Sequence, residues 1–170
     1  MPTYNGVSIQ LPGPPQSGQA LPQLSPDILA ISGPIIQVQI QVPQVLAESL
    51  QKVASPIPPP VQGFALIDTG ASISSADTSV FTQLGVSQNG VAVVGTAGGR
   101  QQQFTYPGRL SFPGTAIPAF DHPRLLGCDL AGHVVLGTPN ARIIALIGRD
   151  ILKLFVFVYN GTAGVWSLSI

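Results

Sequence analysis

Asp68 is the residue of this 170-residue chain best placed to do chemistry. It follows a short apolar run, residues 64–67, and is itself followed by Thr69, Gly70 and Ala71. A carboxylate can act as a general base or acid. Gly70 would let another backbone approach closely, and the Thr69 hydroxyl can both donate and accept hydrogen bonds. Asp, Thr and Gly also form ordinary turns, so these residues alone leave both interpretations open.

Two later segments accompany Asp68. Strands expected at residues 91–94 and 101–106 flank a glycine-rich tip, which predicts a hairpin with a mobile end. The tip comprises Gly95, Thr96, Ala97, Gly98 and Gly99. About 80 residues after Asp68, an apolar run at 143–147 leads into Gly148, Arg149 and Asp150, where we expect a short helix near 149–154. Taken alone, the hairpin is equally typical of an exposed β-turn.

In this order, the three segments resemble those of the retropepsins, the retroviral-type aspartic proteases, and most nearly those of bacterial retropepsin-like proteins. The resemblance implies a closed β-barrel-like acid protease fold with a single lobe per chain. It also implies one catalytic carboxylate per subunit, here Asp68. The chain has a single Asp-Thr-Gly tripeptide and is too short for two lobes. A homodimer would therefore be needed to bring two copies of Asp68 together across a two-fold axis.

The resemblance also assigns roles around Asp68. Two adjacent carboxylates share one proton, so the ionised one can activate a water while the other polarises the scissile carbonyl of a polypeptide substrate. Thr69 would bond to the opposite subunit, and Gly70 would offer its carbonyl to the substrate. The segment from Gly95 to Gly99 would be a flap that closes over an extended peptide. This chemistry requires neither a metal nor a cofactor.

Two parts of the resemblance stay open. In retroviral relatives, the residue matching Arg149 pairs with an acid just after the catalytic segment, but Ser72 stands at that place here. Asp77 or Asp150 could replace the acid, or Asp150 could simply favour the start of its helix. The C-terminal strand expected at 165–170 could enter a dimer sheet. Alternatively, it could form a hairpin with residues 155–159 across a turn at Asn160 and Gly161.

Composition limits the other functions. The chain has seven basic and seven acidic residues, so nothing favours binding to nucleic acid or to an anionic membrane. No apolar stretch reaches membrane-spanning length. His122 and His133 lack metal-ligand spacing, and the lone Cys128 has no convincing histidine partner, which favours a buried thiol. With no secretory signal and one free cysteine, we expect a cytoplasmic protein.

Abundant Gly and Pro between short β-branched runs predict an all-β domain at residues 35–170, with one or two short helices. Strict alternation of Ile or Val with Gln predicts a half-buried strand at 36–42, and helices are expected at 44–53 and 78–84. Further strands are expected near 109–112, 115–119, 132–137 and 143–147. The stretch holding Asp121 and Asp129 is interpreted as a loop. Residues 1–34, rich in Pro, Gln and Gly, are interpreted as a flexible extension or as a removable pro-segment.

A peptidase and a binding protein both fit this pattern. The first hypothesis is an aspartic endopeptidase. The second is a non-catalytic dimeric module of the same fold that binds peptides or joins a larger assembly. The intact Asp-Thr-Gly at Asp68 favours the enzyme, because a binding groove has no need of paired acids.

Overall fold

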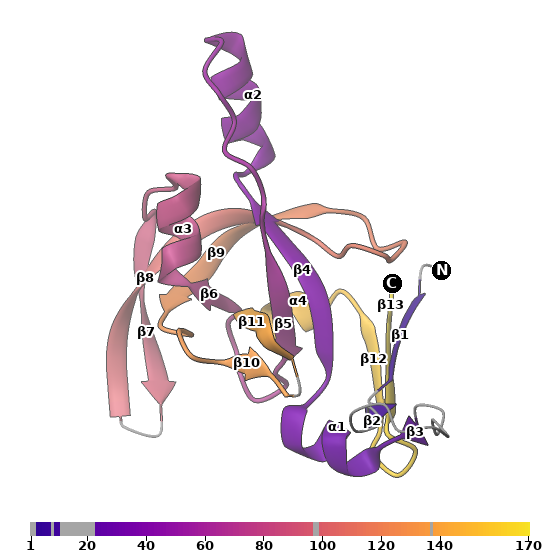
Figure 1. The fold of residues 1–170 in the computed structure, drawn as a ribbon. Coiled ribbons are helices and arrows are strands. Elements are labelled where there is room, and N and C mark those ends of the chain that lie inside the picture. Colours follow the sequence, from indigo (N-terminus) through magenta and orange to yellow (C-terminus); the bar gives the residue numbers. More distant parts are fainter. Residues whose placement is uncertain (1–2, 8, 11–22, 97–98, 137) are drawn as a thin grey trace.

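The computed structural model describes residues 3–7, 9–10, 23–96, 99–136 and 138–170 (Figure 1). The strands are β1 (Thr3–Val7), β2 (Ile9–Gln10), β3 (Gln23–Leu24), β4 (Ile35–Gln41), β5 (Val61–Ile67), β6 (Ser75–Asp77), β7 (Gly90–Thr96), β8 (Gly99–Ser111), β9 (Phe120–Cys128), β10 (Val134–Val135), β11 (Thr138–Ile147), β12 (Val156–Asn160) and β13 (Val165–Ser169). The helices are α1 (Pro26–Ser32), α2 (Gln44–Lys52), α3 (Thr78–Leu84) and α4 (Arg149–Leu152).

The protein is mostly β, with 48% strand and 19% helix, as its composition predicts. The main sheet runs β10-β11-β5-β4-β8-β9-β6, with β7 paired to β8. Because β6 also pairs with β11, six strands close into a ring. The sheet is mixed: β5 with β11 and β6 with β9 run parallel. The ring is therefore not the regular barrel that we expected, and the described residues contain four helices rather than one or two.

The alternating pattern of β4 places its apolar residues in the core. Ile36, Val38 and Ile40 are fully buried, while Gln37 is exposed and Gln39 is only partly covered. This confirms the strand predicted from the alternation of Ile and Val with Gln. Since β4 lies between β5 and β8, it anchors the strand that leads directly into Asp68.

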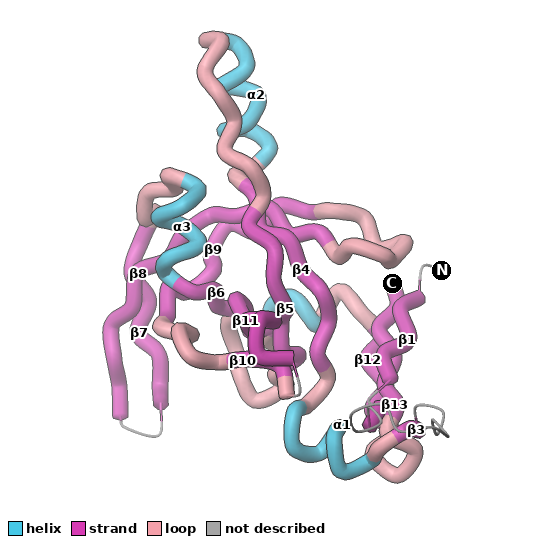
Figure 2. Tube along the Cα trace, viewed as in Figure 1, coloured by secondary structure: helices cyan, strands magenta, loops and turns pink. Residues whose placement is uncertain are grey.

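The helices lie outside the ring (Figure 2). α3 begins at Asp77, whose Oδ1 accepts a hydrogen bond from the Ser79 backbone N at 2.9 Å, and ends at Gly85, which is left-handed with φ of 63°. The helix predicted at 78–84 is thus confirmed, and the structure shows a capping residue at each end of it. α2 projects away from the sheets, and none of its residues is buried. It is the longest described helix, and its nine residues are too few to cross a bilayer.

β9 corrects the sequence interpretation. The stretch around Asp121, interpreted as a loop, is a strand, whereas the strand expected at 115–119 is an irregular connection. Pro123 made a strand look unlikely because proline cannot donate a backbone hydrogen bond. It lies where the β8–β9 register shifts, between the Leu125 and His122 pairings, so its missing N–H breaks no ladder bond.

A second sheet joins the two ends of the chain in the order β1-β13-β12. The hairpin interpretation of the C-terminal segment is confirmed: β13 pairs with β12 on one side and with β1 on the other. The Trp166 ring packs on Tyr4, with ring centroids 5.3 Å apart. A Cβ on Gly6 would lie 2.0 Å from that ring, so only glycine fits there. β13 therefore has no free edge to enter a dimer sheet.

The segment 1–34, interpreted as a flexible extension, contributes elements in its described parts. Residues 3–7 form β1, and α1 begins at its cap Ser25, whose Oγ accepts from the Ile28 backbone N at 3.2 Å. Leu29 of α1 is fully buried in the core. The sequence allows a single local element at residues 24–31, which overlap α1, but it gives no signal for the strand at residues 3–7.

Candidate active site

Asp68 stands at the carboxyl end of β5, between β4 and β11. Its backbone N donates to the Ile147 carbonyl at 2.9 Å, which ties it to the end of β11. The half-buried side chain turns back onto its own loop: Oδ1 accepts from the Gly70 backbone N at 2.9 Å and from the Ala71 N at 3.2 Å. No hydrogen bond from the described residues reaches Oδ2. The loop therefore orients the carboxyl group and leaves one oxygen available to a ligand.

Arg149 supports the same loop through hydrogen bonds to its backbone carbonyls. Its Nη1 donates to the carbonyls of Thr69 at 2.7 Å and of Gly70 at 2.9 Å, and its backbone N donates to the Ala71 carbonyl at 2.9 Å. Of the open alternatives for Arg149, a pair with Asp77 or with Asp150 is not among the ion pairs of the described residues. Position 72 has no acid, and the guanidinium binds carbonyls instead. The Gly70 carbonyl, expected to face substrate, already accepts this bond, although a carbonyl has a second lone pair.

Asp150 and Ser74 form a buried network that the sequence did not reveal. Oδ1 of Asp150 accepts from the Ser74 backbone N at 2.9 Å and from the Ser74 Oγ at 2.6 Å. The Ser74 Oγ in turn accepts from the Gly148 N at 2.8 Å. Ser74 has no exposed surface. A Cβ on Gly148 would lie 2.9 Å from the Ile73 carbonyl carbon, so glycine allows two loops to cross.

His122 joins this network from β9. Its Nε2 lies 3.4 Å from the Asp150 Oδ2, and its Nδ1 accepts from the Arg124 backbone N at 3.4 Å. The pKa of His122 is lowered, chiefly because burial penalises the charged ring. The positive charges of Arg124 and Lys153 lower that pKa further, while Asp150 opposes them. A neutral ring with its proton on Nε2 fits both contacts.

The predicted flap is a hairpin of β7 and β8. Gly95 pairs with Arg100, and Thr96 pairs with Gly99, whose φ is 108°. Ala97 and Gly98, which complete the predicted tip, lie outside the described residues. A hairpin at the expected place is confirmed.

A cavity of about 270 Å³ separates the hairpin from the Asp68 loop. The loop side includes Gly70, Ala71 and Ile73, and the hairpin side includes Val94 and Gly95. The remaining lining is formed mainly by Leu126, Cys128, Leu130 and Leu146. The structure thus gathers the three sequence segments: the loop and hairpin face one cavity, and Arg149 supports the loop.

Cys128 lines this cavity but is poorly suited to act as a nucleophile. Its Sγ lies 3.5 Å from the Ala76 carbonyl. Burial raises the pKa of the thiol, and the charges of Asp77 and Asp129 raise it further, against a hydrogen bond with Ser75. The thiol therefore stays protonated near neutral pH, as the sequence interpretation held.

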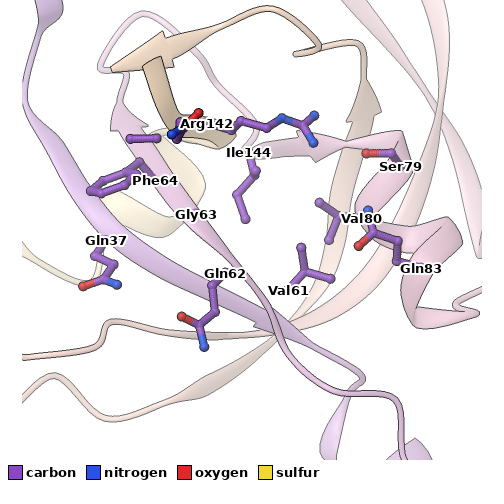
Figure 3. A pocket seen from close by; sticks show the side chains of 12 residues that line it. Gln37, Val61, Gln62, Gly63, Phe64, Ser79, Val80, Gln83, Arg142 and Ile144 are labelled. Atoms are coloured by element: carbon purple, nitrogen blue, oxygen red, sulfur yellow. The ribbon is translucent and has the colours of Figure 1, made fainter. Parts of the chain in front are cut away.

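Other hollows are separate from Asp68. One of about 360 Å³ lies among β5, α3 and β11, and Figure 3 shows Arg142 reaching across it toward Ser79. None of the predicted catalytic residues lines it. Across the described ranges, no group of three or more His, Cys, Asp or Glu side chains could hold a metal ion.

Comparisons with protein-family models, with curated proteins and with solved structures found no match. The arguments for a function therefore rest on the geometry around Asp68 and on the resemblance of its segments.

Proposed function

We propose that the protein is an aspartic endopeptidase of the retropepsin type that works as a homodimer. The observation that supports this most directly is the Asp68 carboxyl group. It stands at a strand end and is oriented by two loop amides. Asp68 itself does not line the cavity, but the residues that follow it in the loop, 70–73, do, and the hairpin borders that cavity on the other side. A carboxylate held this way can activate a water beside a peptide that lies under the hairpin.

The second copy would supply the second acid. Thr69 and Gly70 are exposed and Asp68 is only half-buried in a single chain, so the tip of this loop is open to a partner. Across a two-fold axis at the loop, two Asp68 carboxyl groups would share one proton. The ionised one takes a proton from water as that water attacks the scissile carbonyl. The other protonates the developing oxyanion, which gives a tetrahedral diol. When the diol collapses, this second carboxylate takes its proton back, and the first carboxyl group gives the leaving amine the proton that it took from water.

The cavity suggests which substrates are cleaved. Its lining includes the side chains of Val94, Ile73, Leu126, Leu130 and Leu146. Such a surface favours an apolar substrate side chain, because burial stabilises by about 25 cal/mol per Å² of apolar area. The adjacent β7–β8 hairpin offers backbone groups that can pair with an extended peptide. We therefore propose polypeptides with an apolar residue beside the scissile bond as substrates.

The test is Asp68→Asn, with Asp129→Asn as the matched control, since Asp129 is an exposed acid that accepts a local hydrogen bond from the Ala131 backbone N. Both variants and the parent chain are incubated with a diverse peptide library at acidic to neutral pH, and products are identified by mass spectrometry. Asp68→Asn should lower kcat at least about a hundredfold, while oligomeric state and circular dichroism stay unchanged. Cleavage by purified Asp68→Asn at the parent rate would refute the mechanism. Peptide binding without products in the parent chain would support the non-catalytic module.

A further inference from the structure

A hollow of about 580 Å³ lies beside the base of the β7–β8 hairpin. Residues 89–91 line one side together with Thr105 of β8, residues 122–124 of β9 line another, and Asp150 and Lys153 line it near α4. It shares none of its lining residues with the cavity next to Asp68. It therefore needs an explanation separate from peptide cleavage.

Positive charge gathers in this hollow. The chain has only seven Lys and Arg residues. Two of them, Arg124 and Lys153, line the hollow beside the neutral ring of His122. The pKa of His122 is lowered by both cations, which places them within electrostatic reach of one ring. In a chain of zero net charge, such a grouping costs free energy unless something negative offsets it.

The protein itself offsets little of that charge. Arg124 and Lys153 are exposed, and neither forms an ion pair in the part of the chain that the structure describes, where the pairs are Arg109–Asp121 and His122–Asp150. Asp150 is the only acid in the lining. Its Oδ1 already accepts two hydrogen bonds from Ser74 and its Oδ2 faces His122. The two exposed cations remain available to a ligand.

We propose that this hollow is a binding site for a doubly charged oxyanion of the phosphate class. The Arg124 guanidinium can donate two parallel hydrogen bonds to such a group, and the Lys153 ammonium can add a point charge. The hollow is much larger than one oxyanion, so the anion would belong to a larger molecule. That molecule is either a small phosphorylated compound or a phosphorylated side chain of a peptide. The site does not depend on the proposed peptidase activity.

Isothermal titration calorimetry of the full chain tests this, with sulfate, inorganic phosphate and pyrophosphate as probes and chloride added to hold ionic strength constant. We expect saturable binding that Arg124→Gln and Lys153→Gln each weaken by about tenfold or more, since two charge-assisted hydrogen bonds are lost in the first and one in the second. Arg142→Gln is the matched control, because Arg142 is also an exposed arginine that lines a hollow and forms no ion pair within the described residues. Both target residues are exposed, so melting temperatures should not change.

The proposal would be overturned if no probe bound saturably. Equal weakening by Arg142→Gln and Arg124→Gln would also overturn it, because that would indicate general charge attraction. The Asp68→Asn variant should bind the probes as the parent chain does, which separates this site from the peptidase. A phosphoserine peptide and its glutamate counterpart identify the source. Preference for the phosphopeptide over pyrophosphate indicates a phosphorylated protein, and the reverse indicates a small molecule. Equal binding of the glutamate peptide and phosphopeptide would contradict the phosphate class.

Discussion

Asp77 offers the sharpest test of how this fold holds together. Its side chain is 4% exposed and joins β6 to α3. Oδ1 caps α3 through the Ser79 backbone N, and Oδ2 accepts from the buried Leu130 N at 2.9 Å. In Asp77→Ala, losing the cap costs about 1 kcal/mol, and leaving the Leu130 N–H unpaired costs about 2 kcal/mol. The free energy of unfolding should therefore fall by about 3 kcal/mol, a large part of the usual 5–15 kcal/mol.

Urea unfolding followed by far-UV circular dichroism measures this loss. Asp129→Ala is the control, because Asp129 is exposed and accepts one local bond, from the Ala131 N at 2.9 Å. That variant should change the free energy of unfolding by less than about 1 kcal/mol. The reasoning fails if the two variants lose the same amount, since burial and the Leu130 bond would then contribute nothing.

The same carboxylate should make stability depend on pH. Burial raises the pKa of Asp77, but hydrogen bonds from Ser79 and Leu130 and the charge of Arg142 together outweigh it, and the net pKa is lowered. When the pKa of a carboxyl group is lower in the folded state than in the unfolded state, its ionised form stabilises the fold. That stabilisation is complete at pH values above the unfolded-state pKa of about 3.9, and it is lost as the pH falls through the folded-state pKa. The difference in free energy of unfolding between the parent chain and Asp77→Asn should therefore become smaller at acidic pH. A difference that stays constant from pH 7 to about pH 2 would contradict this sign.

Two further substitutions probe the support of the Asp68 loop. Gly148→Ala would place a Cβ 2.9 Å from the Ile73 carbonyl carbon and should lower the melting temperature by several degrees. Gly95→Ala is the control, because a Cβ there meets nothing within 4 Å. Equal melting temperatures of the two variants would show that the close approach of the Gly148 and Ile73 loops does not require glycine. Arg149→Gln removes the guanidinium that binds two loop carbonyls. It should lower kcat of the proposed peptidase by about tenfold or more with little change in KM. Arg142→Gln is the control, and an unchanged kcat would show that the loop needs no such support.

Local patterns account for the parts of the fold that were predicted correctly. The alternation in β4 and the two caps of α3 are visible within about ten residues of sequence, since they depend on side-chain period and on capping chemistry. The hairpin of β7 and β8 was also expected, from two short strand patterns on either side of a glycine-rich tip. These features need no knowledge of distant contacts.

Contacts between distant residues account for most of what was missed. Ser74 and Asp150 are 76 positions apart, so nothing near either residue indicates their hydrogen bonds. The contact of His122 with Asp150 depends on β9, and Pro123 led to the interpretation of that strand as a loop. The ring closure between β6 and β11 rests on a three-residue strand, too short to carry a period. The cavity lining combines five separate segments and could only be seen in three dimensions.

The pairing of β1 with β13 makes the two ends of the chain interdependent. Thr3 lies opposite Ser169 and Gly6 opposite Trp166, and the indole ring covers that glycine. A shortened chain beginning at Ile35 would leave the backbone groups along one side of β13 to water and would uncover Trp166. Proteolytic trimming of the amino terminus would therefore change the opposite terminus, where fluorescence should report a more solvent-exposed Trp166 as emission shifted to longer wavelength.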